Sequence, residues 1–400
     1  MPPFRAPGAL RHHVVLLALL ALPVAAAQAG DPVATPSPAL PVQPTAPVVS
    51  EVVAPVAQNV TSGVADGARS IDARLAAPRV GRHAGFTRVV LDLPGRTSFT
   101  VLPLGKTLRV DLGGVTTDTT VLRNLSDDLP SLALTPGVGG ATLTLDTQGV
   151  TALGGWRAAL LPADAAHAAR LVLDVSPALV NRAPLGPLEV VAVLPRPSVT
   201  LAQQTQDELN VVIDAGHGGR WPGAIGVVTE KDVTLRVALK VRDDLEAAGI
   251  HVKLTRDGDS TFSDDLVTDL RLRPGLADAN TRAFVSIHCN SLPAASAGRG
   301  FGVETWWNPN HPLSSTLAAS VQSNVVGLTS AYSRGLKHDV SLAVLRNATV
   351  PAALVEIGFV SHPLDGTNLQ DEAYLDRVAL GIARGVRDTL ARPETPLATR

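Results

Sequence analysis

The sequence predicts an α/β domain, an open sheet with helices on its faces, preceded by a small all-β sandwich. Two stretches of the chain with different patterns indicate this order. In residues 72–177, short segments of alternating apolar and polar residues are separated by Gly and Pro turns, as in a small antiparallel sandwich. In residues 208–392, strand-like apolar runs alternate with helical patterns, which is typical of a sheet covered by helices.

Length and composition narrow the class of protein. A chain of 400 residues accommodates two or three domains, and 45% hydrophobic residues suffice for a substantial core. A formal net charge of −2 gives no electrostatic reason to expect a nucleic-acid partner, and only 3% aromatic residues argue against base-stacking platforms. Cys289 is the only cysteine, which excludes an internal disulfide, and we expect it to be a small buried hydrophobe.

Residues 1–29 have the pattern of a signal peptide. Arg5 and Arg11 precede an apolar stretch that runs from residue 14 to 27, and Ala27-Gln28-Ala29 fits a small-x-small cleavage site. The apolar stretch is shorter than the ~20 residues that a membrane-spanning helix needs. We therefore expect an exported protein without a transmembrane segment after cleavage, located in the periplasm or the cell envelope.

Two linkers and a tail separate and follow the predicted domains. Residues 30–71 are rich in Pro and Ala, and prolines at this density disfavour both helices and strand ladders, so an extended tether is expected. Residues 178–207 contain further prolines and are interpreted as the second linker, and residues 393–400 as a tail.

The strands of the β sandwich are predicted from period-2 alternation. They are expected at residues 87–93, 107–112, 141–145 and 170–175. The sandwich contains no cluster of titratable residues of metal-ligand type. This favours a binding or spacing module over an enzyme.

The strands of the α/β domain are predicted from apolar runs. They are expected at residues 209–214, 251–255, 283–288, 303–307 and 352–357. In open α/β sheets, ligands lie beyond the carboxyl ends of the strands. His217, His288 and Glu356 fall at or just past strand ends, so we expect their side chains to converge.

Four residues of the α/β domain are candidates for hydrolytic chemistry. His217 lies in a Gly-rich turn, where a structural role is the alternative, and Glu230 opens a predicted helix, where the alternative is capping. His288 and Glu356 lie in apolar strands, where an unpaired polar side chain is costly. Asp214 is either a further ligand or, as we favour, a partner that orients the His217 imidazole.

Two histidines and one carboxylate form the ligand set of a hydrolytic zinc site. Zinc with three protein ligands lowers the pKa of its bound water from about 15.7 to about 7 and polarises a carbonyl. A second carboxylate, for which Glu356 is the best candidate, accepts the proton and passes it to the leaving amine. The sequence therefore predicts an amide hydrolase with a Zn²⁺ cofactor.

The α/β region resembles the zinc-dependent N-acetylmuramoyl-L-alanine amidases of the amidase-3 type. The resemblance rests on VVIDAGHGG, TEKDVTL, VKLTRDGD, FVSIHCNS, GVETWW and VEIGFVSH, in this order. It implies a twisted mixed sheet flanked by helices. It also implies that His217, Glu230 and His288 are zinc ligands and that Glu356 is the catalytic carboxylate. For Asn290 and Arg346 it implies a contact with the stem peptide or a position near the metal; the alternative for Arg346 is a surface or strand-end ion pair.

The expected substrate is peptidoglycan, cleaved between muramic acid and the first alanine of the stem peptide. The order FTRVVLDL…TSFTVLPLGKTLRVDLGG in the β sandwich resembles the AMIN domain, which implies targeting to the envelope through peptidoglycan. The alternative for this region is a generic β sandwich that binds no ligand. Two alternatives remain: a non-catalytic peptidoglycan-binding protein, and a zinc peptidase that acts within the stem peptide. The sequence indicates no particular activator or divisome protein.

Overall fold

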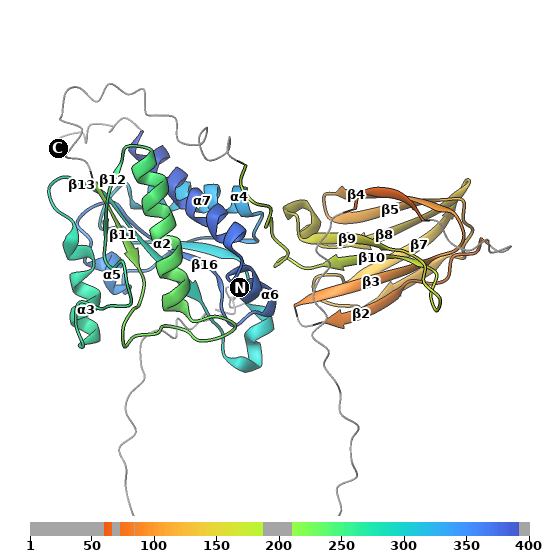
Figure 1. The fold of residues 1–400 in the computed structure, drawn as a ribbon, viewed down its shortest axis with the longest axis horizontal. Coiled ribbons are helices and arrows are strands. Elements are labelled where there is room, and N and C mark those ends of the chain that lie inside the picture. The colour runs from red at the N-terminus through yellow and green to blue at the C-terminus, as the bar shows by residue number, and fades with distance from the viewer. Residues whose placement is uncertain (1–59, 66–72, 84, 187–209, 392–400) are drawn as a thin grey trace, which may run out of the picture. The chain divides into compact units, whose positions relative to one another are not determined.

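The computed structural model describes residues 60–65, 73–83, 85–186 and 210–391 (Figure 1). The predicted signal peptide, most of both linkers and the tail lie outside the described residues.

The β region consists of two antiparallel sheets, with strand orders β1-β4-β5-β8-β7-β6 and β2-β3-β10-β9. The first contains β1 (Ser62–Ala65), β4 (Thr97–Leu104), β5 (Thr107–Gly113), β8 (Gly140–Asp146), β7 (Ser131–Gly137) and β6 (Thr120–Arg123). The second contains β2 (Arg79–His83), β3 (Phe86–Leu93), β10 (Ala169–Val175) and β9 (Trp156–Leu161). A 3₁₀ turn, η1 (Val150–Leu153), precedes β9.

Alternation along the strands explains the core of the β region. In β3, Val89, Leu91 and Leu93 are fully buried and join one apolar cluster, because every second side chain of a strand points to the same face. The predicted start of this domain at residue 72 is too late. The earlier strand β1 pairs with β4 along its whole length, so the domain begins by residue 60.

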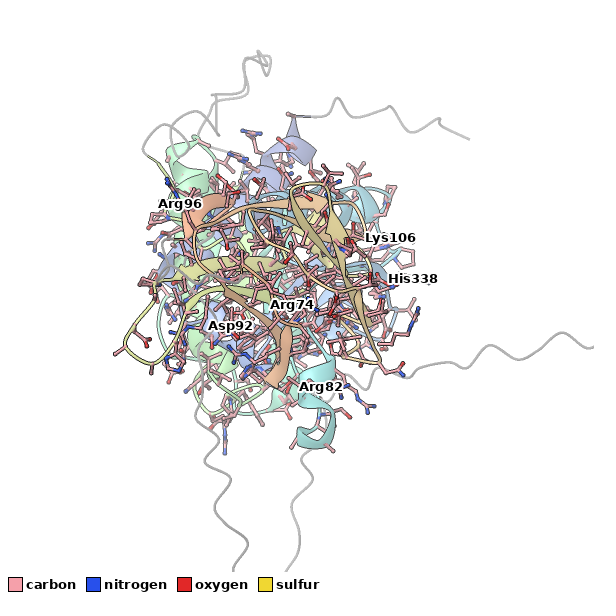
Figure 2. The ribbon with its side chains drawn as sticks, turned by 90° about the vertical axis from the view of Figure 1, so that its right-hand side faces the viewer. Arg74, Arg82, Asp92, Arg96, Lys106 and His338 are labelled. Carbon is pink, nitrogen blue, oxygen red and sulfur yellow. The ribbon has the colours of Figure 1, made fainter. Side chains whose placement is uncertain are left out.

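Exposed ion pairs lie on the surface of the β region, where Figure 2 labels Arg74 and Asp92. Arg74 pairs with Asp118, and Arg79 donates to Asp92 at 2.7 Å. Such exposed pairs each contribute at most about 1 kcal/mol, so the apolar core is the main source of this domain's stability.

The α/β region is built on a mixed six-stranded sheet of order β12-β11-β13-β16-β14-β15, which confirms the expected architecture. The strands are β11 (Asn210–Ala215), β12 (His251–Leu254), β13 (Thr281–Asn290), β14 (Val303–Trp307), β15 (Ser333–His338) and β16 (Ala352–Phe359). β14 pairs antiparallel with β16, and every other neighbouring pair is parallel. The carboxyl ends of β11, β13 and β16 therefore meet at one edge.

Helices cover this sheet. They are α2 (Glu230–Ala247), α3 (Leu266–Leu272), α4 (Ser314–Thr329), α5 (Ala343–Arg346), α6 (Pro363–Asn368) and α7 (Glu372–Leu390), with 3₁₀ turns η2 (Pro274–Leu276) and η3 (Ala294–Arg299). α7 packs between α2 and α4 (Figure 1). The predicted i, i+4 stripe of α2 is buried: Val233, Val237, Val241 and Leu245. Among the described helices, none combines the length and the apolar character that crossing a bilayer requires.

The structure corrects the second linker, which was predicted to span residues 178–207. Ala178, Leu179 and Val180 are buried, and Val180 belongs to the apolar core of the α/β region. Asn368 Nδ2 donates to Ala178 O at 2.6 Å. The segment that follows β10 is therefore packed against the α/β domain and is not a free linker.

Candidate metal centre

The candidate residues of β13 and β16 point to the face of the sheet that α2, α4 and α7 leave free. Val285, Ile287 and Cys289 of β13 join the apolar core with these helices, so the alternate residue His288 faces the other way. His288 is in register with Glu356 of β16. One row across the sheet thus presents an imidazole beside a carboxylate.

His217 is presented by a strained turn directly after β11. Its φ is 64°, and Gly218 and Gly219 follow with φ values of 127° and 51°. A non-glycine residue in the left-handed region costs about 1–3 kcal/mol and persists only where its surroundings hold it. The glycine-rich turn therefore serves to bring the His217 imidazole back toward the sheet edge.

Glu230 is the first residue of α2, and its carboxylate is buried. Oε1 accepts from the backbone N–H of Cys289 at 2.9 Å, and Oε2 accepts from that of Ala224 at 2.7 Å. Thr229, the predicted N-cap, has the extended backbone of a cap but makes no side-chain capping hydrogen bond. Glu230 is consequently oriented toward His288 instead of serving only as a helix-start acid.

The three predicted ligands converge. Glu230 Oε1 lies 3.1 Å from His217 Nε2 and 3.0 Å from His288 Nδ1, and the ligand atoms of all three residues lie within 4.8 Å of one another. Burial alone would raise the pKa of Glu230, but the attraction of His217 and the contacts with both imidazoles lower it below its usual value. An ionised carboxylate between two imidazoles is a donor set that suits Zn²⁺.

The surroundings of these donors also fit a metal ion. His217 Nε2 is buried and has no hydrogen-bond partner among the described residues, because its contact with Glu230 is not aligned for one. A buried nitrogen without a partner is costly, and a metal ion would satisfy it. Gly223 has no side chain that would crowd these two ligands, whereas a Cβ there would lie 2.5 Å from Glu230 Oε2 and 2.6 Å from His217 Cδ2.

Glu356 is 4% exposed, and its Oε2 has no hydrogen-bond partner among the described residues. Burial, followed by repulsion from Glu230 and Glu304, raises the pKa of Glu356 well above its usual value. A carboxyl group with a raised pKa and a free oxygen is suited to accept a proton and release it again.

Glu304, directly opposite Glu356 on β14, is a functional candidate that the sequence analysis missed. It is 1% exposed, and its oxygens accept from Asn290 Nδ2 at 2.9 Å and from Arg334 Nε at 2.7 Å. The signal that revealed Glu356, an acid inside an apolar strand, was equally present in GVETWW. Glu304 therefore holds the side chains of Asn290 and Arg334 in place beside Glu356.

The two predicted substrate contacts differ in exposure. Asn290 is 4% exposed, and its amide bonds to Glu304 and to the backbone of Ser291, so it is placed to shape the site from beneath. Arg346, at the end of α5, is exposed. Of the two, only Arg346 has an exposed side chain.

Asp214 does not hydrogen-bond to the His217 imidazole that we expected it to orient. Its carboxylate accepts from Thr255 at 2.7 Å, Ser286 at 2.6 Å and Arg273 at 2.8 Å. Burial acts to raise the pKa of Asp214, but the attraction of Arg273 and these hydrogen bonds bring it below its usual value. Asp214 is thus the centre of a buried ionic network beneath the turn that carries His217.

Gly216→Ala is expected to weaken metal binding at least tenfold, the lower end of what lost outer-shell support typically costs. A Cβ on Gly216 would lie 2.5 Å from His288 Nε2 and 2.6 Å from the carbonyl oxygen of Ile287, so the imidazole or the turn must shift. Zinc affinity measured against a competing chelator tests this.

Gly327→Ala is the control for that substitution. A Cβ there meets nothing within 4 Å on the exposed side of α4, so it should stabilise the helix by up to about 1 kcal/mol and leave zinc affinity unchanged. Equal zinc affinities for Gly216→Ala and the unmodified protein would contradict the crowding argument.

Comparison with known proteins relates this geometry to a family. Residues 211–388 match the family model described as N-acetylmuramoyl-L-alanine amidase. The chain is 32% identical over 186 residues to the germination-specific N-acetylmuramoyl-L-alanine amidase of Bacillus subtilis, an alignment that covers 44% of this chain and 77% of that protein. It is 31% identical over 185 residues to the probable cell wall amidase LytH of Staphylococcus epidermidis, covering 44% of this chain and 57% of that protein.

Solved structures include a similar domain. The catalytic domain of CwlV, an N-acetylmuramoyl-L-alanine amidase from Bacillus (Paenibacillus) polymyxa var. colistinus, shares 34% identity, with a TM-score of 0.40. That alignment covers 46% of this chain and 98% of the solved chain.

Proposed function

Because the chain belongs to the amidase-3 family of N-acetylmuramoyl-L-alanine amidases, we propose that it is a zinc-dependent enzyme that cleaves peptidoglycan between N-acetylmuramic acid and L-alanine. The observation that carries the zinc proposal is the convergence of His217, Glu230 and His288, together with the buried His217 Nε2, which lacks a hydrogen bond among the described residues. The sheet presents Glu356 beside them.

The roles of the residues follow from their surroundings. When bound by His217, Glu230 and His288, zinc supplies Lewis acidity, which lowers the pKa of water and polarises an amide carbonyl. Glu356 takes up the proton released as water attacks the carbonyl, and it donates a proton to the leaving amine of the alanine. The buried position of Glu356 favours the protonated carboxyl, so it holds the proton between these two events.

The substrate is recognised, in this proposal, at the open side of the same face. Arg346 supplies an exposed guanidinium for a carboxylate of the stem peptide, a pairing that guanidinium geometry favours. Asn290 acts indirectly: its side-chain amide donates to Glu304 and so holds that carboxylate in place beside Glu356.

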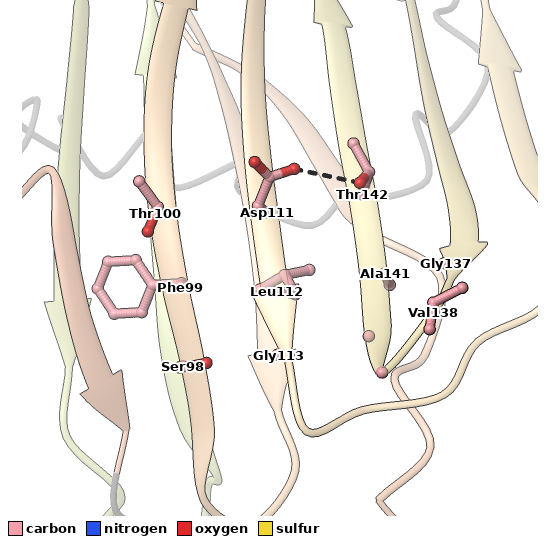
Figure 3. Close-up of a pocket in the computed structure, with 12 residues that line it drawn as sticks. Ser98, Phe99, Thr100, Asp111, Leu112, Gly113, Gly137, Val138, Ala141 and Thr142 are labelled. Atoms are coloured by element: carbon pink, nitrogen blue, oxygen red, sulfur yellow. Dashed lines mark hydrogen bonds between the residues drawn. The ribbon is translucent and has the colours of Figure 1, made fainter.

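We further propose that the signal peptide exports the enzyme and that the β region, an AMIN-like domain, holds it at peptidoglycan. Cell wall amidases among the relatives support a location in the envelope. The β region has a pocket lined by glycines, apolar residues and four polar side chains, Ser98, Thr100, Asp111 and Thr142, where Thr142 Oγ1 donates to Asp111 at 3.2 Å (Figure 3). Hydroxyl and carboxylate groups of this kind suit hydrogen bonding to a glycan or a peptide.

A digest of purified peptidoglycan tests the proposed activity. Amidase action is expected to expose new N-terminal alanine and to leave muramic acid intact, as read by N-terminal labelling and mass spectrometry. Cuts further along the stem peptide would instead indicate a zinc peptidase, and binding without products would indicate a non-catalytic protein. In the same assay, a chain lacking residues 60–177 should still cleave soluble fragments but should sediment less with intact sacculi.

A further inference from the structure

Two buried arginines lie beneath the turn that carries His217. Arg256 and Arg273 are 5% and 2% exposed, and neither belongs to the ligand set. Burying a guanidinium is costly unless every donor is used. What these donors bind therefore indicates what the arginines do.

Arg273 reaches the turn from the end of α3. Its Nη2 donates to the carbonyl oxygen of His217 at 2.7 Å, and its Nη1 donates to that of Ala215 at 2.9 Å. The same Nη1 lies 2.8 Å from Asp214, and Nε donates to Asp269 at 2.8 Å. Two carboxylates thus hold the guanidinium while it holds two carbonyl groups of the turn.

Arg256, two residues after the end of β12, binds the same turn. Its Nε donates to Ala215 O at 2.9 Å, and its Nη2 donates to Gly216 O at 3.0 Å. Nη2 also donates to Lys231 O at 2.7 Å, in the first turn of α2 and next to Glu230. Arg256 therefore joins the segment that carries His217 to the helix that carries Glu230.

The network also reaches the strand of the third ligand. Asp214, held by Arg273, accepts from Ser286, which lies two residues before His288 on β13. The carbonyl groups of residues 215, 216 and 217 consequently all face guanidinium donors. The arginines bind the segments of His217 and Glu230 directly, and Asp214 links them to the strand of His288. This arrangement also supplies the support that the left-handed backbone of His217 requires.

We propose that Arg256 and Arg273 are positioning residues that set the spacing of His217, Glu230 and His288 and thereby the affinity of the site for zinc. The inference rests on the zinc site of the proposed function. Lysine keeps the charge at either position, but its single ammonium cannot reproduce the fork of donors that spans neighbouring carbonyl groups.

The test compares zinc affinities of the full chain, measured with a competing chelator, with thermal unfolding of the metal-free protein. Arg256→Lys and Arg273→Lys are expected to bind zinc about 10–100-fold more weakly, as is typical when partners of ligands are lost. At saturating zinc, kcat should recover and KM should stay unchanged. Arg377→Lys is the matched control, because Arg377 is a buried arginine that donates to Ala183 O, outside this network.

Each outcome decides the proposal. Zinc affinities within twofold of the unmodified protein in both folded variants would overturn it, as would an equal loss in Arg377→Lys. If neither lysine variant folds, Thr255→Val decides, since it removes the bonds of Thr255 to Asp214 and to the backbone of Ala215 while leaving both arginines in place. Its zinc affinity must then fall severalfold. An unmodified protein that binds no zinc would instead refute the proposed function.

Discussion

Glu356→Gln is expected to lower kcat for amide hydrolysis by about 10²–10⁴-fold, the typical contribution of a general base. Glutamine has nearly the same shape but cannot accept and return a proton, and Glu356 Oε2 is the buried carboxylate oxygen without a hydrogen bond beside the ligands. KM should change little, because the substitution leaves the exposed substrate contacts in place. Release of N-terminal alanine from soluble muropeptides measures the effect.

Zinc content and stability are the controls for this variant. The three ligands remain, so one zinc per chain is expected. Burial and the nearby Glu230 and Glu304 disfavour the ionised form of Glu356, so replacement by a neutral glutamine should leave the free energy of unfolding equal or higher. If the variant keeps zinc and hydrolyses within tenfold of the unmodified rate, Glu356 has no part in the proton transfer.

His288→Ala is expected to remove zinc from the purified protein. Nδ1 of His288 lies 3.0 Å from Glu230 Oε1, so the substitution deletes one of three ligands and also deprives a buried carboxylate of a partner. The loss of affinity should exceed the 10–100-fold that substitutions of outer partners cause. Elemental analysis after dialysis, together with the absence of amide hydrolysis, provides the measurement.

His251→Ala separates this effect from histidine removal in general. His251 is exposed on β12, the strand at the sheet edge, and belongs to no metal-capable group among the described residues. Its substitution should leave zinc content at one per chain. Unchanged zinc in His288→Ala would exclude this residue from the ligand set.

The sequence carries clear signals for strands and for unusual side chains within them. β3, β5, β8, β10 and the central strands of the α/β sheet all lie within a few residues of their expected positions, because alternation and apolar runs report burial directly. His288 and Glu356 stand out because burying a polar side chain in an apolar strand is costly unless it is paired or bound. Glu304 carried the same signal and was overlooked, since it had no role in the chemistry already assembled.

Other features had no local signal. β15, with the sequence SRGLKH, is an edge strand with few apolar residues, so its pattern does not resemble a buried strand. Residues 178–183 read as a proline-flanked linker, yet Val180 and its neighbours are buried by side chains from elements far away in sequence. Burial of this kind depends on the partner surface, which a local pattern does not describe.

By itself, the sequence determined the chemistry: two imidazoles and two carboxylates in an order and context that indicate amide hydrolysis. The tertiary structure alone decided what supports them. Nothing in the sequence distinguishes Arg273 from the nearby Arg271, but Arg273 is buried and binds the turn of His217, whereas Arg271 is exposed. The physical reason is range. Residue type and alternation are properties of neighbouring positions, whereas hydrogen bonds between segments about 40 to 60 residues apart exist only once the sheet has brought those segments together.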